Sequence, residues 1–433
     1  MTSLYPYQRL GAQFLAARRR AMLADEQGLG KTAQAIEAAN LVDADPVLVV
    51  CPASVRSSWA RDVRAFATPG RRFVIESYDK VARDPDTYDG PWGALLLDEA
   101  HYLKSLSAKR THAIYGSRTM RGLLSLSGHV WALTGTPAPN YPVEMYTHMR
   151  KLFPESLAMA SDSSRAYDHD AFMHRYCILQ DKGFGKKVIG AKNTDDLRAR
   201  LAPHVLRRLK KDVLPDLPDI RYEPLLFDAP DVVASLRDIP GDEMAAARRA
   251  IETNGVEGLT ALSVHLATLR RVTAMAKAEL VFQWARTFLE ETDRKLVIFG
   301  HHVEPLEYIV KKLSGVYRTA KGDPLVPPHI FGSTRSDHRA NAIEAFQNDP
   351  RKRVFLGQIH AAGTGITLTA ASDLVFVDQS WTPADNAQAA MRIHRIGQRR
   401  GCLIRYATLA GSIDEAVQTV LARKARDLSK IFD

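Results

Sequence analysis

The sequence predicts an α/β protein with two parallel-sheet domains. Residues from about 20 to 150 and from about 276 to 411 alternate short apolar runs with helical patterns, as successive βαβ units do. The chain has 433 residues, about three times the ~150 residues of a typical domain. Its apolar share of 45% and charged share of 25% are globular values. A disordered chain is therefore excluded, and more than one domain is expected.

Six short apolar runs predict the buried strands, because runs of four or five apolar residues bounded by turn-forming residues are typical of parallel sheets. They are Val47–Cys51, Ala94–Leu97 and Val130–Leu133 in the first stretch, and Lys295–Phe299, Arg353–Leu356 and Leu374–Val377 in the second.

The segment between the two stretches has a different character. It is mostly helical in pattern, and prolines punctuate residues 212–240, which favours a linker there. We therefore expect a first domain over 1–211, with a helical extension from about 151. A linker and helical segment follows over 212–275, and a second domain spans 276–433. Ser412 and Glu415 form a capping-box pattern that predicts a C-terminal helix.

Several classes of protein are excluded by simple features. No apolar run approaches the ~20 residues that a membrane span needs, and the N-terminus lacks the apolar core of a signal peptide. Cys51, Cys177 and Cys402 lie far apart, without metal-ligand spacing, so we expect no zinc site and a reducing compartment. We expect no membrane and a cytoplasmic location in a bacterium or in the host of a virus, or a nuclear one in a eukaryote.

The charge balance favours a polyanionic partner. Lys and Arg number 59 against 49 Asp and Glu, a net charge of +10. Residues 198–211 hold six basic residues and no acid, and residues 391–405 hold five arginines and no acid. Such runs are typical of nucleic-acid contacts. A basic enzyme with solvated charged faces is the alternative.

A glycine-containing loop before a helix predicts a phosphate site. Backbone N–H groups at a helix N-terminus bind phosphate oxygens, and glycines let the backbone approach closely. In this reading Lys31 binds the β- and γ-phosphates of ATP, and the hydroxyl of Thr32 binds Mg²⁺. The usual pattern starts with glycine, whereas Asp25 stands there in this chain. The expected ATP-binding residues of the loop are Asp25, Glu26, Gln27, Gly28, Leu29, Gly30, Lys31 and Thr32.

A second acidic signal follows the predicted strand 94–97. Asp98 and Glu99 come directly after it, where the carboxyl ends of parallel strands place ligand-binding groups. Asp98 is expected to hold Mg²⁺, directly or through water, and Glu99 to orient or deprotonate the attacking water. A plain helix start with Asp as its cap is the alternative, and the phosphate loop about 65 residues earlier argues against it.

Motifs along nearly the whole chain resemble the Swi/Snf-type DNA translocases of helicase superfamily two. The similar segments include DEQGLGKT, LLLDEAHYLKS, LTGTPAPN, HVLRRLKKDVLPDLP, AAGTGITLTAA and QAAMRIHRIGQ, and in the last the ending Arg-x-His-Arg-x-Gly-Gln is the most diagnostic. Residues 271–277 and 299–302 are similar to the small HepA-related, annealing-helicase branch. The resemblance implies two tandem RecA-like lobes of the P-loop NTPase class, with parallel sheets, helical insertions and an ATP cleft between the lobes.

The resemblance also implies roles for single residues. Arg392 and Arg395 would act as arginine fingers on the γ-phosphate, and a surface role on a basic helix is their alternative. Gln8 would read adenine, and Gln388 would contact nucleotide or neighbouring motif residues. Residues expected to couple the ATP site to the nucleic-acid path are Thr134, Gly135, Thr136, Gly363 and Gly365.

A motor that ignores sequence contacts mainly the sugar-phosphate backbone. The resemblance gives six candidates for this role, of which Trp381 is equally readable as a core aromatic. For the basic run 207–211 we expect a mixed role, in phosphate contact and in arranging the lobes. The six candidates are Ser54, Arg56, Lys104, Arg335, Thr364 and Trp381.

The implied activity is ATP-dependent translocation on double-stranded DNA, with ATP and Mg²⁺ as cofactors. Its outcome would be fork remodelling, strand annealing or displacement of bound proteins. DNA repair, replication or defence proteins are possible further partners. A strand-separating DNA or RNA helicase is one alternative. A nucleotide-switched DNA-binding subunit of a larger complex is the other.

Overall fold

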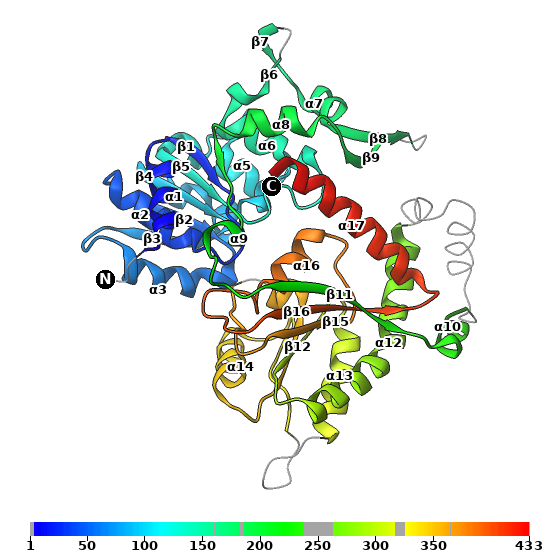
Figure 1. Ribbon diagram of the computed structural model, residues 1–433. Helices are drawn as coiled ribbons and strands as arrows, with labels where there is room; N and C mark the ends of the chain where they lie inside the picture. Colours follow the sequence, from blue (N-terminus) through cyan, green and yellow to red (C-terminus); the bar gives the residue numbers. More distant parts are fainter. Residues whose placement is uncertain are drawn as a thin grey trace. The chain divides into compact units, whose positions relative to one another are not determined.

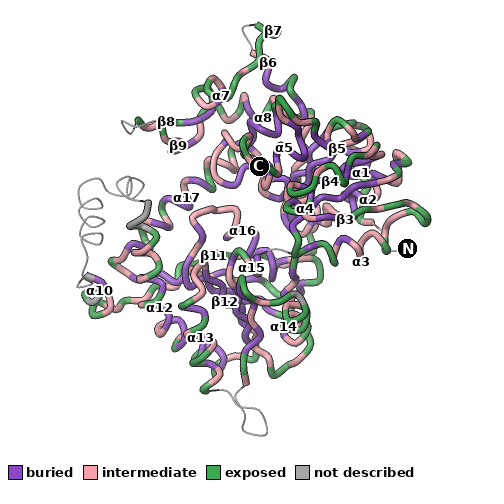
Figure 2. Tube along the Cα trace, turned by 180° about the vertical axis from the view of Figure 1, so that it is seen from behind, coloured by how far each residue is buried: buried purple, intermediate pink, exposed green. Residues whose placement is uncertain are grey.

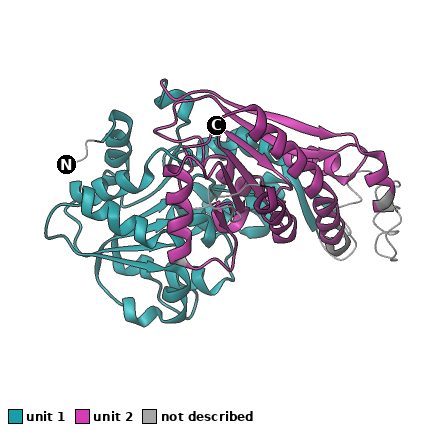
Figure 3. Ribbon diagram, turned by 90° about the horizontal axis from the view of Figure 1, so that it is seen from below, with its two compact units in different colours: residues 1–215, 424–433 teal, residues 216–423 magenta. Residues whose placement is uncertain are grey.

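The computed structural model describes residues 4–159, 162–181, 186–237, 263–316, 325–363 and 365–432. The chain divides into two compact units, which Figure 3 shows in separate colours. Unit 1 comprises residues 1–215 and 424–433, and unit 2 comprises residues 216–423. The sequence-based boundaries at 211 and 276 differ from this division, because residues 216–275 group with the second unit.

The described part of unit 1 contains a six-stranded parallel sheet in the order β10-β1-β5-β4-β2-β3. Its strands are β1 (Arg20–Leu23), β2 (Val47–Cys51), β3 (Phe73–Ser77), β4 (Trp92–Asp98), β5 (Ser127–Leu133) and β10 (Val205–Leu206). The three strands expected from the apolar runs of this domain are therefore confirmed, and β4 and β5 extend a little beyond those runs.

Helices lie between the strands of unit 1 in sequence (Figure 1). The α-helices are α1 (Pro6–Ala16), α2 (Lys31–Leu41), α3 (Arg56–Phe66), α4 (Tyr78–Arg83), α5 (Lys109–Tyr115), α6 (Tyr146–Leu152), α7 (His169–Tyr176), α8 (Thr194–Leu201) and α9 (Lys210–Val213). The 3₁₀ turns are η1 (Ala53–Val55), η2 (Pro85–Tyr88), η3 (Ala100–Leu103), η4 (Leu123–Leu126), η5 (Pro142–Met145) and η6 (Pro154–Leu157).

The extension after residue 151 is not purely helical. Besides α7 and α8 it contains two antiparallel strand pairs within the described residues. These strands are short and only partly buried, so they carry no long apolar run from which a strand can be predicted. The pairs are β6 (Ala158–Met159) with β7 (Asp162–Ala166), and β8 (Cys177–Asp181) with β9 (Lys186–Ala191).

Each face of the unit 1 sheet has its own apolar core. Strand β2 shows why, since Leu48 and Val50 point into one cluster and Val47 and Val49 into the other, as period-2 alternation requires. Figure 2 shows the buried segments running through the strands of the sheet. Because both faces of the sheet are covered by apolar clusters, only the ends of its strands are available for a functional site.

Unit 2 repeats the architecture. Its described sheet also has six parallel strands, in the order β11-β16-β15-β12-β14-β13. The strands are β11 (Ile220–Phe227), β12 (Leu296–Gly300), β13 (His329–Ile330), β14 (Val354–Gln358), β15 (Asp373–Phe376) and β16 (Cys402–Leu409). The helices are α10 (Pro230–Arg237), α12 (Ser263–Glu291), α13 (Val303–Val316), α14 (Ser336–Asn348), α15 (Ile359–Ala362), α16 (Pro383–Ala390) and α17 (Ile413–Phe432).

Strand β11 lies where the sequence predicts a linker. Its eight residues pair in parallel with β16, although Pro224 removes one backbone donor. A proline is tolerated because β11 is the edge strand. Its mostly exposed residues hide the strand from an apolar pattern.

Helix α17 begins where the capping pattern predicts. Ser412 Oγ accepts the backbone N–H of Asp414, and Glu415 Oε1 accepts the N–H of Gly411. The last part of the helix, from Lys424, belongs to unit 1, where Ile431 packs into the core. Among the described helices, none combines the length and apolar character needed to cross a membrane.

Candidate functional site

Three loops of unit 1 meet at one edge of its sheet. Strands β1, β5 and β4 are neighbours, and they are followed by residues 24–30, 134–136 and 99–101 respectively. The carboxyl ends of parallel strands share one edge, which is where α/β sheets bind ligands. The structure therefore brings the predicted phosphate loop, the acidic pair and the Thr-Gly-Thr segment together.

The phosphate loop owes its shape to two glycines. Gly28 and Gly30 have φ of 92° and 72°, a left-handed conformation that other residues rarely adopt. Gly30 ends the loop, and α2 begins at Lys31. A Cβ at Gly30 would lie 2.4 Å from Gln8 Nε2. The loop thus needs glycine both for its backbone angle and for its packing against α1.

Lys31 is held by the loop that it closes. Its Nζ donates to the carbonyls of Asp25 at 2.7 Å and Glu26 at 3.3 Å. Burial lowers the pKa of the Lys31 ammonium, and the carboxylates of Glu99 and Asp25 oppose this shift. These carbonyl bonds keep the ammonium in the loop, at the place where a phosphate is expected to bind.

Asp25 replaces the usual glycine and is fully buried. Arg208 binds it with two hydrogen bonds, from Nε to Oδ1 at 3.0 Å and from Nη2 to Oδ2 at 2.5 Å. Gln34 Nε2 also donates to Asp25, at 3.1 Å, and Arg208 donates onward to the carbonyl of Tyr7 and to Gln34 Oε1. The aspartate is thus the centre of a buried network that braces the loop.

Arg207 and Lys210, from the same basic run 207–211, also contact this loop. Arg207 Nη1 donates to the carbonyls of Ala24 at 3.0 Å and Gly135 at 3.2 Å. The backbone N–H of Lys210 donates to Glu26 Oε2 at 2.7 Å. These contacts all lie within unit 1 and hold the phosphate loop, and the mixed role in phosphate contact and in arranging the lobes stays a prediction.

Both carboxylate oxygens of Asp98 are oriented by donors. Trp59 Nε1 donates to Oδ2 at 2.7 Å, and the N–H of Glu99 donates to Oδ1 at 3.0 Å. Tyr78 Oη donates to the Asp98 carbonyl at 2.8 Å. Burial, together with the neighbouring charge of Glu99, raises the pKa of Asp98 to about 6. A cation beside this carboxylate would reverse that shift, as a metal site requires.

Glu99 has a backbone that L-residues rarely adopt, with φ of 49° and ψ of 51°. Such conformations concentrate at functional sites. Its Oε2 lies 3.4 Å from His101 Nδ1, which in turn lies 3.2 Å from Thr134 Oγ1. The side chains thereby connect the acidic pair to the Thr-Gly-Thr segment.

The Thr-Gly-Thr segment packs directly on the phosphate loop. A Cβ at Gly135 would lie 2.6 Å from the side chain of Gln27, so only glycine fits there without a shift. Thr134 is fully buried, and its Oγ1 accepts the N–H of Thr136 at 3.1 Å. The position of Gly135 and Thr134 suits the predicted coupling role, which stays a prediction.

Gln8 supports the loop through its amide. Its Nε2 donates to the carbonyl of Leu29 at 3.2 Å, and its Oε1 accepts the N–H of Tyr5 at 3.0 Å. Tyr7 Oη donates to the same Leu29 carbonyl at 3.1 Å. These bonds give Gln8 a structural role, and adenine recognition by it stays a prediction.

The donor set of unit 1 suits Mg²⁺. Thr32 follows Lys31 at the start of α2, and Asp98 lies near Lys31, whose charge acts on its pKa. Mg²⁺ prefers one or two protein oxygens plus phosphate and water. In the described part of the chain, no group of three or more His, Cys, Asp or Glu is placed to hold a metal ion, so an all-protein cage is not the expected form.

In unit 2 the arginines of the Arg-x-His-Arg segment bind the loop after α15. Arg392 is 2% exposed. It donates from Nε to the Gln388 carbonyl at 2.9 Å and from Nη1 to the Ile366 carbonyl at 3.3 Å. Arg395 is half-buried and donates from Nη1 to Thr367 Oγ1 at 3.2 Å. Helix α16 ends at Ala390, so the two arginines do not share an α-helical face.

The contacts separate the two arginines. Arg392 has the surroundings of a structural residue, whereas Arg395 lies nearer the surface of unit 2. Gln388 is buried at the end of α16. The backbone at Gly363 lies close to the carbonyl of Ile359, because a Cβ at this position would lie 2.2 Å from the carbonyl oxygen. Gly365 has a left-handed backbone, with φ of 69°.

The candidate DNA contacts have different environments. In unit 1, Ser54 and Arg56 are exposed just after β2, and Arg56 lies 3.4 Å from Glu76. Lys104 Nζ donates to Glu144 Oε1 at 2.6 Å. The side chain of Lys104 therefore already has an acidic partner.

Unit 2 contributes three more candidates. The side chain of Arg335 is 79% exposed. Trp381 packs against an apolar cluster that includes Leu269 and Val417, which favours its core role. Thr364 lies outside the described residues. All six DNA contacts stay predictions.

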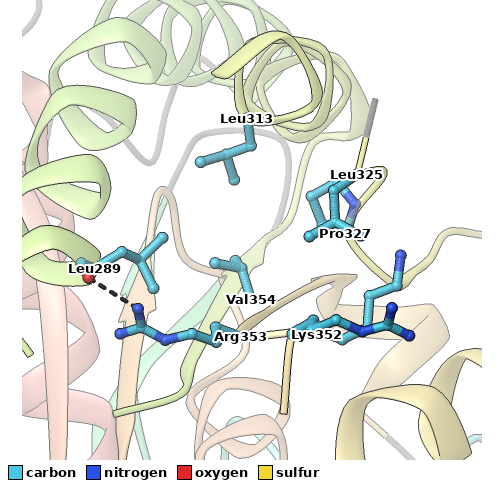
Figure 4. Close-up of a pocket in the computed structure, with 8 residues that line it drawn as sticks. Leu289, Leu313, Leu325, Pro327, Lys352, Arg353 and Val354 are labelled. Carbon is cyan, nitrogen blue, oxygen red and sulfur yellow. Dashed lines mark hydrogen bonds between the residues drawn. The ribbon is translucent and has the colours of Figure 1, made fainter. Parts of the chain in front are cut away.

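An apolar cavity of about 110 Å³ lies in unit 2, beside the start of β14 and between the ends of α12 and α13 (Figure 4). At the wall of the cavity, Arg353 donates to the carbonyl of Leu289, which lies in the last turn of α12. The candidate site residues are absent from its described lining, so we assign it to packing. The lining residues are Leu289, Leu313, Leu325, Pro327, Arg351, Lys352, Arg353 and Val354.

Sequence reasoning missed two residues of the site. Trp59 gives no sequence signal, because its contact with Asp98 is made across 39 positions. Arg208 had a signal in Asp25, since a carboxylate in a buried loop needs a partner. The basic run nearby supplied the candidate, but spacing alone does not show which arginine pairs with it.

Two parallel-sheet units, with a phosphate loop and an acidic strand end in the first, define a P-loop nucleotide-binding protein of helicase-like organisation. The SNF2-related domain matches residues 7–227, and the helicase conserved C-terminal domain matches residues 277–397. The chain belongs to the SNF2-related family.

The curated relatives are longer than this chain. The mouse "DNA annealing helicase and endonuclease ZRANB3" is 30% identical over 98% of this chain and 40% of its own length. The Drosophila melanogaster "SWI/SNF-related matrix-associated actin-dependent regulator of chromatin subfamily A-like protein 1" is 30% identical over 99% of this chain and 56% of its own. The chain thus spans about two fifths to three fifths of these relatives.

A solved structure is also similar. The Sulfolobus solfataricus SWI2/SNF2 ATPase core in complex with dsDNA is 23% identical, over 99% of this chain and 94% of that one, with a TM-score of 0.43.

Proposed function

We propose that this chain is a DNA-dependent ATPase that uses Mg²⁺-ATP to move along double-stranded DNA. The observation that carries the proposal is the meeting of Lys31, Asp98 and Glu99 at one sheet edge in a chain of the SNF2-related family. The names of the relatives, which include a DNA annealing helicase, support DNA as the polymer. Fork remodelling, annealing and protein displacement are the outcomes that we expect such movement to produce.

The residues of unit 1 would perform the first part of the cycle. Lys31 would exchange its bonds to the loop carbonyls for bonds to the β- and γ-phosphates, and the loop N–H groups would bind the remaining oxygens. Bound Mg²⁺ would neutralise phosphate charge, with Asp98 and Thr32 as its protein-side partners. Glu99 would orient the attacking water or take its proton, and its contact with His101 would carry the change to Thr134.

The residues of unit 2 would complete the transition state. The two arginines have unequal burial, so we assign Arg395 to the γ-phosphate and Arg392 to holding the loop after α15. An arginine finger contributes ~10³–10⁵ in rate. A site completed from a second unit is active only when the units are aligned, which is how bound DNA would stimulate hydrolysis.

A steady-state ATPase measurement tests the proposal. At low salt, blunt double-stranded DNA is expected to raise the rate at least about tenfold, equivalent to ~1.4 kcal/mol, and Lys31→Ala is the inactive control. Equal rates with and without DNA would contradict it. Turnover that stays near zero with DNA would favour the nucleotide-switched binding subunit. Displacement of a strand from a tailed duplex would favour the strand-separating helicase.

A further inference from the structure

A hydrogen bond links helix α3 to the carboxylate of the proposed metal site. Trp59 lies in α3 and is 1% exposed. Its Nε1 donates to Asp98 Oδ2 at 2.7 Å. The indole has a single polar hydrogen, so Trp59 donates no other hydrogen bond from its side chain. The position of α3 is therefore transmitted to one particular carboxylate oxygen.

The same helix begins at the segment predicted to contact DNA. Ser54 lies in η1, and Arg56 is the first residue of α3. Trp59 is three residues further on, a neighbouring position on the helix surface. A phosphate held by Arg56 competes with Glu76, which lies 3.4 Å from the guanidinium. Replacing that ion pair by a phosphate contact would act on the first turn of α3, which also contains Trp59.

The geometry of Asp98 makes it sensitive to this bond. A carboxylate has about four acceptor positions. Trp59 and the Glu99 N–H occupy one on each oxygen, and the others remain for a metal ion or its water. The terminal torsion of Asp is broad, so the two donors determine how the carboxylate is turned. A hydrogen bond to an ionised group is also about twice as strong as a neutral one.

We propose that Trp59 is a positioning residue through which DNA bound at Ser54 and Arg56 sets the orientation of the Asp98 carboxylate. The inference rests on the proposed function, because it assigns the route by which DNA acts on the ATP site. It requires a coupling between DNA binding and metal–nucleotide binding that passes through Trp59. Such coupling is reciprocal, so it is measurable as a change in DNA affinity without any turnover.

The test compares duplex DNA affinity without nucleotide and with Mg²⁺ plus a non-hydrolysable ATP analogue. The variant is Trp59→Phe, which removes the donor and keeps an aromatic ring. The matched control is Trp131→Phe. Trp131 is also fully buried, lies in the same apolar cluster and donates its Nε1 to the carbonyl of Arg18 at 2.9 Å. The control thus removes an equal indole bond that does not reach Asp98.

We expect metal–nucleotide to change DNA affinity by at least about 5-fold in the wild type and in Trp131→Phe. In Trp59→Phe the factor should approach 1, while DNA affinity without nucleotide stays unchanged. If metal–nucleotide changes the DNA affinity of Trp59→Phe as much as that of the wild type, the inference is overturned. It is also overturned if metal–nucleotide leaves the DNA affinity of the wild type unchanged while DNA stimulates the wild-type ATPase. A wild type that neither binds duplex nor hydrolyses ATP overturns the proposed function itself.

A second measurement serves if Trp59→Phe does not fold. The chain has five tryptophans, so 5-fluorotryptophan labelling of the wild type gives five ¹⁹F resonances, and that of Trp59 is identified by elimination with Phe variants of the others. Duplex DNA and Mg²⁺ with the analogue, added separately, should each shift the Trp59 resonance and leave that of Trp131 in place. A Trp59 resonance that ignores duplex DNA overturns the inference.

Discussion

Removing Arg208 should destabilise the phosphate loop more than any exposed arginine would. Asp25 is fully buried, and the side chain of Arg208 is 14% exposed. In Arg208→Met the carboxylate keeps only its contact with Gln34 among those described above. Breaking a buried ion pair in this way costs ~3–5 kcal/mol, a large share of the ~5–15 kcal/mol that a domain has.

Hydrogen exchange of α1 and α2 amides, followed by mass spectrometry, measures this loss in unit 1 alone. A cost of ~3–5 kcal/mol corresponds to exchange faster by about 100- to 4,000-fold, at ~1.4 kcal/mol per factor of ten. Arg19 is exposed, and Arg19→Met is the control, with an expected change below ~0.5 kcal/mol.

The double variant Asp25→Asn with Arg208→Met separates charge from packing. Neutralising the buried carboxylate removes the group that the arginine compensates, so most of the protection should return. The two substitutions should therefore be non-additive by ~2 kcal/mol or more. Strictly additive losses would refute the reasoning, because they would mean that Arg208 acts through its own packing.

Three further predictions concern the site, and a fourth concerns His148, a buried histidine of α6. Lys31→Ala should weaken ATP binding, whereas Glu99→Gln should retain ATP and lose turnover; equal losses of affinity in equilibrium titrations would contradict these roles. Arg395→Lys should lower the maximal ATPase rate at least tenfold (~1.4 kcal/mol) with near-normal DNA affinity, because a point charge cannot replace a planar fork; normal turnover with weaker DNA binding would make it a surface DNA contact. Gly135→Ala, whose Cβ would lie 2.6 Å from Gln27, should lower nucleotide affinity in the same titrations, and unchanged affinity would show that the loop yields. His148 is fully buried, and burial lowers its pKa from 6.5 to about 3. Below pH 6.5 the unfolded state therefore binds a proton that the folded state does not, so the free energy of unfolding decreases as the pH is lowered. In urea titrations the free energy of unfolding of His148→Gln, relative to that of the wild type, should rise by about 2 kcal/mol from pH 7 to pH 5, and an unchanged difference would contradict this.

Three strands of each unit, namely β2, β4 and β5 in unit 1 and β12, β14 and β15 in unit 2, were predictable because each contains a run of apolar residues buried on two faces. Strand β2 is an example, with five buried residues. The phosphate loop was predictable because its glycines and Lys31 serve backbone geometry and charge, which are local properties. The fold class and the acidic strand end at Asp98 followed from the same local signals.

The remaining features depend on contacts between distant residues. Strand β11 contains Pro224 and is mostly exposed, so only its pairing with β16 identifies it as a strand. The partners Asp25 and Arg208 are 183 positions apart. Arg392 was recognisable as a motif residue, but the sequence did not show that its side chain is buried and donates to the carbonyl of Ile366, 26 positions away. Residue types therefore indicated the chemistry of the site, whereas only the tertiary contacts show which residues hold the site in place.

A triplex-displacement assay tests the central claim most directly. A third strand bound in the major groove of a blunt duplex is released when a motor passes along the duplex, and no base pair has to open. With ATP and Mg²⁺ the wild-type chain should release the third strand, with a delay that grows with the duplex length before it, and Glu99→Gln should not. Release without ATP, or no release while ATP is hydrolysed in response to the same duplex, would contradict translocation.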